Sequence, residues 1–158
     1  MTRKRTLRKM NIRSTIGGLA GACALTILNE SVKKLDKDAP RMDLLAMNAV
    51  ARLMKGNNLL SQTAGKLFPI ALAGDLVSNS LYYSMADSGD KNKTLIRGGL
   101  LGLGAGLGAV VLPRTLGLND EATTRTLKTK VLTVTWYVIG GLVAAAAINL
   151  LEKNKIGG

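Results

Sequence analysis

The chain contains no histidine and only one cysteine among its 158 residues. Histidine is the usual general base near neutral pH and a frequent zinc ligand, so its absence removes many catalytic and metal sites. A single thiol forms neither an internal disulfide nor a cysteine metal cluster. The sequence therefore predicts a protein that is not an enzyme and that has no metal site and no cofactor.

Aromatic residues are also scarce: they make up 3% of the chain, whereas hydrophobic residues make up 47%. This is too little Phe, Tyr and Trp for the usual core of a soluble domain. Charged residues are segregated, and residues 14–29, 98–113 and 131–151 carry none, while residues 67–86 carry only Asp75. A helix needs about 20 apolar residues to cross a ~30 Å hydrocarbon core. The pattern predicts an all-α integral membrane protein.

Four transmembrane helices are predicted in a single membrane domain that covers residues 1–158. The first follows six basic residues and resembles a signal peptide, but its apolar run continues past Cys23, and we interpret it as a retained helix. At the end of this run, Asn29 and Glu30 either mark the membrane boundary or line a vestibule. The four predicted spans cover about residues 12–30, 67–86, 95–112 and 131–151. Pro69 is expected in the first turn of the second span, and Pro113 is expected to close the third. Trp136 and Tyr137 lie near the start of the fourth span, where interfacial aromatics are common.

An amphipathic helix is predicted at about residues 39–55, in the connection between the first and second spans. Apolar residues recur there at helical spacing from Met42 to Met54. Asp38 is a suitable cap for its N-terminus, and Pro40 is tolerated in a first helical turn. The segment is too short to cross a membrane. Either it lies in the membrane interface, or it packs on the bundle or on a partner subunit.

Asp75 lies in the middle of the second predicted span, where a charge costs about 2.5–3.5 kcal/mol on insertion scales. Ser78, Asn79 and Tyr82 follow at i+3, i+4 and i+7, which places all four side chains on one helix face. Such a polar stripe has two interpretations. It lines a pathway or a binding site for an ion, a proton or a polar head group, or it holds helices together by hydrogen bonds.

Glycines at a spacing of four occur in two of the predicted spans. Small residues at this spacing let helix backbones approach closely, so we predict that they mediate helix packing, within the chain or against another chain. The closely spaced glycines of the third predicted span are not a nucleotide-binding loop, because no strand precedes them and no Lys-Ser/Thr pair follows them. The helix-packing candidates are Gly17, Gly21, Gly98, Gly102, Gly104, Gly106 and Gly108.

The chain is basic, with 22 Lys+Arg against 10 Asp+Glu and a net charge of +12. Basic flanks attract anionic lipid head groups, whereas nucleic-acid binding requires stacking aromatics that the chain lacks. We expect membrane lipid as a partner, no nucleic acid, and a bacterial inner membrane location. Lys and Arg divide equally between the two sides of the four predicted spans, so the positive-inside rule fixes no orientation. The basic N-terminus favours both termini inside, and dual topology is the alternative.

These observations predict a small, oligomeric, polytopic membrane protein that acts as a channel or carrier for a small ion or solute. The polar stripe on the second span would form its path. The alternative is a non-catalytic membrane subunit or scaffold that packs against a partner complex or binds anionic lipid. A third hypothesis, a lipid-modifying enzyme, would have to use carboxylates such as Asp38 and Asp43, which helix capping explains equally well.

Overall fold

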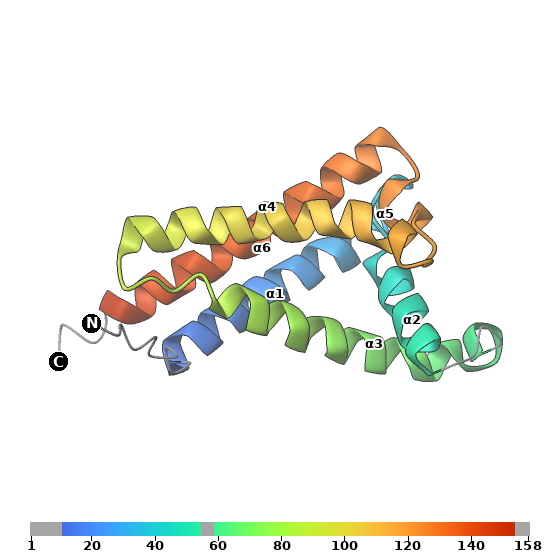
Figure 1. Ribbon diagram of the computed structural model, residues 1–158, viewed down its shortest axis with the longest axis horizontal. Helices are drawn as coiled ribbons and strands as arrows, with labels where there is room; N and C mark the ends of the chain where they lie inside the picture. The colour runs from blue at the N-terminus through green and yellow to red at the C-terminus, as the bar shows by residue number, and fades with distance from the viewer. Residues whose placement is uncertain (1–10, 55–58, 154–158) are drawn as a thin grey trace, which may run out of the picture.

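The computed structural model describes residues 11–54 and 59–153, and every regular element in these two segments is a helix (Figure 1). The all-α class predicted from the sequence is confirmed. The elements in chain order are α1 (Ile12–Val32), α2 (Met42–Leu53), α3 (Leu59–Ser84), α4 (Lys91–Thr115), α5 (Glu121–Thr124) and α6 (Leu127–Lys153).

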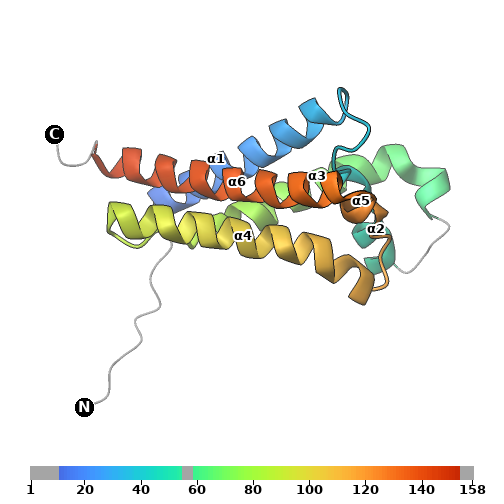
Figure 2. The same cartoon turned by 90° about the horizontal axis from the view of Figure 1, so that it is seen from above.

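The four long helices run up and down along the long axis of the molecule (Figures 1 and 2). α6 packs against both α4 and α1, and α1 packs against α3, while α3 and α4 contact each other little. The turn between α3 and α4 lies at the same end as the start of α1 and the end of α6. The short helices α2 and α5 lie at the opposite end (Figure 1).

Three helices are long and apolar enough to cross a membrane: α1, α4 and the Leu127–Glu152 part of α6. In the most apolar window of α4, only 17% of the residues are buried inside the protein. A soluble bundle would cover this surface or make it polar, so the distribution favours a membrane protein. Most of the predicted span 67–86 lies in α3, which ends at Ser84. This helix is not among the three because Asp75, Asn79 and two tyrosines lower its mean hydropathy.

Helix α4 extends beyond the predicted span 95–112 at both ends. It begins at Lys91 because Asp90 caps it: the Lys93 backbone N–H donates to the Asp90 carboxylate at 2.9 Å. The sequence predicted that Pro113 would end the helix, yet α4 continues to Thr115. Pro69 was likewise expected in a first turn, but α3 already begins at Leu59.

A side chain from another helix compensates for Pro113. Proline has no N–H, so the carbonyl of Ala109, four residues earlier, loses its usual helical donor. The Thr123 hydroxyl donates to this carbonyl at 2.8 Å, and Thr123 is completely buried. The continuation of α4 through Pro113 therefore depends on a contact with α5 that no local pattern reveals.

Thr123→Val is expected to destabilise the protein by about 1–3 kcal/mol, because it leaves the carbonyl of the half-buried Ala109 without a donor. Thermal unfolding in detergent measures the effect. Thr135→Val removes a hydroxyl that bonds the Val131 carbonyl on an exposed face, and should change stability much less. Adding Pro113→Ala to Thr123→Val restores a backbone N–H that can donate to the Ala109 carbonyl, and should recover part of the lost stability. A double variant with the same melting temperature as Thr123→Val alone would contradict this explanation.

The α2 helix begins later than the sequence suggested. It starts at Met42, so Pro40 precedes the helix, and Asp38 does not cap it. The backbone N–H of Arg41 instead donates to the carbonyl of Ala122 at 2.8 Å, which ties the start of α2 to α5. This tertiary hydrogen bond replaces the expected side-chain cap.

Glycines bring the backbones of α4, α6 and α1 into direct contact. A Cβ atom added to Gly102 would lie 2.5 Å from the Tyr137 carbonyl oxygen, and one on Gly106 would lie 2.7 Å from the Val134 Cα. Gly98 faces α6 in the same way, and Gly17 and Gly21 of α1 also face α6. Two glycines that the sequence analysis did not single out complete these contacts from the α6 side. They are Gly140, opposite Gly21, and Gly141, opposite Gly98.

Candidate functional site

A pocket of about 560 Å³ lies between α2, α3 and α4, where α3 and α4 diverge. All four residues of the polar stripe predicted from the sequence line it: Asp75, Ser78, Asn79 and Tyr82. The stripe therefore faces a ligand-sized space rather than the tightly packed interface of α1 with α6. Tyr137 of α6 also lines the pocket.

The rest of the pocket wall is apolar. α2 contributes Met42, Leu45, Ala46 and Ala49, and α4 contributes alanines and Leu112. Gly104 and Gly108 of α4 line the pocket too, and neither lies against the backbone of another helix in the described residues. A Cβ on Gly104 would be 3.4 Å from the Tyr82 hydroxyl. The missing side chains leave room for the pocket, which is a different role from the predicted helix packing.

Asp75 is held by its neighbour on the stripe. The Asn79 side-chain amide donates to the Asp75 carboxylate at 2.9 Å. Within the described residues, Asp75 forms no ion pair, and Ser78 is exposed with no hydrogen bond from its hydroxyl. The Tyr82 hydroxyl donates to the Leu101 carbonyl at 3.1 Å, so it connects α3 to α4 across the pocket. The pocket thus offers acceptor groups at Asp75 and Ser78 beside an apolar wall.

The sequence patterns did not identify two buried tyrosines next to the polar stripe. Tyr83 falls off the polar stripe, and Tyr137 was interpreted as an interfacial aromatic near the start of the fourth span. Both are buried, and the Tyr83 hydroxyl donates to the Tyr137 carbonyl at 2.8 Å. Tyr137 does not lie near the start of its helix, because α6 begins at Leu127, which places this residue well inside the helix and against the core.

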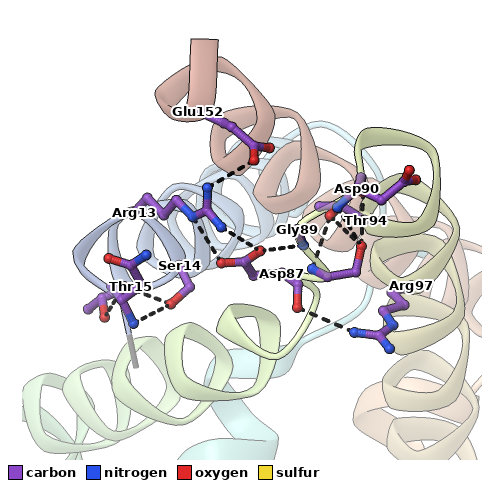
Figure 3. A network of polar contacts seen from close by, with 11 residues as sticks. Arg13, Ser14, Thr15, Asp87, Gly89, Asp90, Thr94, Arg97 and Glu152 are labelled. Carbon is purple, nitrogen blue, oxygen red and sulfur yellow. Dashed lines mark hydrogen bonds and ion pairs between the residues drawn. The ribbon is translucent and has the colours of Figure 1, made fainter. Parts of the chain in front are cut away.

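A charged network closes the end of the bundle where the α3–α4 turn lies (Figure 3). The Arg13 guanidinium of α1 donates to the Asp87 carboxylate at 3.1 Å and pairs with Glu152 of α6, also at 3.1 Å. Asp87 further accepts from the Gly89 backbone N–H, and its own carbonyl accepts from Arg97 of α4. One arginine therefore joins α1, the turn and α6 at this end.

Arg13→Ala is expected to lower stability by about 1–3 kcal/mol, because it removes charge-assisted hydrogen bonds to a carboxylate that is only 7% exposed. Arg125→Ala is the matched control, since Arg125 is exposed and forms no ion pair with the residues described here. The melting temperatures of both variants in detergent measure the difference. Equal melting temperatures would mean that the network does not hold the helices together.

A second charged network joins α1 to α2 at the opposite end. The Lys33 ammonium pairs with Glu30 at 2.6 Å and with Asp43 at 3.1 Å, and Arg41 pairs with Asp43 at 3.0 Å. Burial alone would raise the pKa of the Asp43 carboxyl, but the hydrogen bonds from Arg41 and Lys33 outweigh it and hold that pKa below its ordinary value. These two carboxylates and two cations balance in charge.

The described residues form an all-helical fold in which three helices are apolar enough to cross a membrane and a pocket of ligand size lies beside the helix core. No protein-family model matches the chain, and no curated protein or solved structure shows significant similarity to it.

Proposed function

We propose that this protein is a membrane carrier for a small organic cation, which binds in the pocket between α2, α3 and α4. The observation that supports the proposal is the position of the polar stripe: its four residues line one side of a pocket of about 560 Å³. Small-molecule sites have volumes of roughly 300–1,000 Å³ and are mostly apolar with a few placed polar groups. A carrier holds its ligand at one such site, and we therefore favour a carrier over a channel.

The wall of the pocket sets the chemistry of the ligand. Asp75 provides a carboxylate without an ion-pair partner among the described residues, and the free hydroxyl of Ser78 accepts or donates a hydrogen bond. The alanines, leucines and Met42 around them favour an apolar body. A ligand with a cationic group on an apolar body matches both parts of the wall.

In this proposal α3 is a fourth transmembrane helix, despite its lower hydropathy. Its polar face is directed to the pocket, while Ile70, Val77 and Leu81 are at least half exposed. In a membrane these exposed side chains would contact lipid, and the polar ones would be kept away from it. With four spans, the start of α1 and the end of α6 lie on the same side of the membrane.

Ethidium, an aromatic cation, is a suitable first probe. Its entry into liposomes that contain DNA is followed by fluorescence, with the full-length protein reconstituted in the membrane. We expect uptake that is faster than in protein-free liposomes and that saturates with ethidium concentration, as binding to a single site requires. Uptake at the protein-free rate would contradict the carrier proposal for this class of ligand.

A second candidate function is an accessory subunit that packs against another membrane protein. The observation in its favour is the outer face of α4, where Leu95, Ile96, Leu100, Leu103 and Leu107 are exposed. Lipid contact explains this face equally well. Native mass spectrometry of the protein extracted into nanodiscs separates the two: a stoichiometric foreign subunit favours the accessory role, whereas copies of this chain alone favour the carrier.

A further inference from the structure

A second, much smaller cavity lies on the other side of Asp75, between α1, α2 and α3. Its volume is about 20 Å³, and a cavity needs roughly 10–15 Å³ to hold one water-sized particle. Its polar lining consists of Thr26, Asn29 and Glu30 from α1, Asp43 from α2, and Asp75 from α3. Asp75 lines both this cavity and the larger pocket.

Two acceptor atoms in this cavity lack hydrogen-bond donors. The side-chain oxygen of Asn29 and the hydroxyl oxygen of Thr26 are both buried and have no partner among the described residues. Asn29 as a whole is only 5% exposed. A buried acceptor without a partner is unfavourable, so these atoms indicate a particle that supplies positive charge or hydrogen-bond donors from within the cavity.

The charge balance around the cavity favours a cation over water. Glu30 and Asp43 are paired with Lys33 and Arg41, so their charges cancel. The negative charge of Asp75 is left without a cationic partner in the part of the chain that the structure describes. Burying an unpaired charge is unfavourable, and one bound monovalent cation would neutralise it.

We propose that this cavity is a sodium-ion site formed by the Asn29 side-chain oxygen, the Thr26 hydroxyl and the Asp75 carboxylate. Hard cations prefer such oxygen ligands. Calcium sites usually supply several carboxylates, whereas within the described residues no group of three or more acidic, histidine or cysteine side chains is placed to hold a metal ion. A single negative charge in a cavity for one particle fits a monovalent ion.

The shared carboxylate gives the site a consequence for transport, which rests on the function proposed above. Sodium in the small cavity and an organic cation in the large pocket would both be neutralised by Asp75. Two cations that depend on one carboxylate weaken each other's binding, and the effect is reciprocal. Sodium is therefore expected to compete with ethidium, and an opposing sodium gradient to drive its exchange.

Sodium binding is tested first without any organic cation. The melting temperature of the full-length protein in detergent is compared in NaCl and in MgCl2 at equal ionic strength and pH. Magnesium requires about six ligands in octahedral geometry and gives up its water reluctantly, so it does not suit this small cavity. A ligand that binds only the folded state raises the melting temperature as its concentration rises above the dissociation constant. We expect a higher melting temperature in NaCl that saturates with concentration, and no saturating rise in MgCl2.

Variants then locate the site. Asn29→Ala and the near-isosteric Thr26→Val should each reduce or abolish the sodium response. The oxygen atom that each substitution removes has no hydrogen-bond partner among the described residues, so neither change breaks a hydrogen bond of that oxygen. Asn149→Ala is the matched control, because Asn149 also has a buried, unpaired side-chain oxygen but lies on α6, away from the cavity. It should retain the full response. Ser78→Ala should also retain it while weakening ethidium binding.

The two proposals fail in distinguishable ways. Equal melting temperatures in sodium and magnesium chloride, or a full sodium response in both Asn29→Ala and Thr26→Val, would overturn the sodium site. Ethidium uptake that persists without any effect of sodium would overturn the site and leave the carrier intact. A sodium response that depends on Asn29, together with no ethidium uptake, would support the site and contradict the carrier.

Discussion

Asp75→Asn should reduce protein-dependent ethidium uptake by more than about tenfold at low ethidium concentration. The substitution keeps the shape of the side chain and removes the negative charge that faces the pocket. Loss of one partner from a desolvated charge pair costs about 2–5 kcal/mol, and 1.4 kcal/mol already corresponds to a factor of ten in affinity. Initial uptake rates in liposomes with equal amounts of reconstituted protein measure the effect.

Asp38→Asn is the matched control for this experiment. It makes the same chemical change at a carboxylate that lies outside the large pocket and that forms no side-chain hydrogen bond within the described segments. Its uptake should equal that of the unmodified protein. Circular dichroism and the melting temperature establish that Asp75→Asn is folded. A folded Asp75→Asn protein that takes up ethidium at the normal rate would remove the central residue from the carrier proposal.

Gly102→Ala should destabilise the protein by about 1–3 kcal/mol, the usual cost of forcing extra volume into a packed contact. Its Cβ would lie 2.5 Å from the Tyr137 carbonyl oxygen and 2.6 Å from the Val138 Cα, and both are backbone atoms that move only if α4 and α6 separate. Thermal unfolding in detergent measures this loss. The same separation would widen or distort the pocket beside Tyr137.

Gly99→Ala provides the comparison on the same helix. Its Cβ would lie 3.6 Å from a Leu142 side-chain carbon, which is an ordinary contact. Both substitutions replace glycine by alanine inside α4, which by itself favours the helix by up to about 1 kcal/mol. The difference between the two variants therefore isolates the backbone contact. If both variants have the same melting temperature, the close approach of α4 and α6 does not contribute to stability.

The polar stripe and the glycines show which features of the site helical periodicity predicts. Asp75, Ser78, Asn79 and Tyr82 were placed on one face by their spacing alone, and in the structure all four line one pocket. The same spacing rule grouped Gly104 with Gly108, which also lie together. Periodicity identifies residues that share a helix face, but it does not state what the face meets, and these two glycines border the pocket instead of another helix.

The prolines and the first apolar run show where local reasoning fails. Pro113 was expected to end its helix, but Thr123 supplies the missing donor from a residue outside that helix. Asn29 was assigned either to the membrane boundary or to a vestibule, and the structure places it in a buried cavity beside Asp75, which is 46 positions later in the sequence. In each case the deciding partner is distant in sequence, so a local window does not contain it.

The sequence by itself determined the helical class, the apolar segments and the polar stripe, because these depend on composition and on the helical period. Tertiary structure alone decided that α3 and α4 diverge, that Gly104 and Gly108 leave space there, and that Tyr137 reaches the pocket. It also decided that Asp75 meets two cavities, since this requires α1, α2 and α3 to converge on one side chain. Pockets form between elements, and the relative positions of elements are set by packing that no single segment encodes.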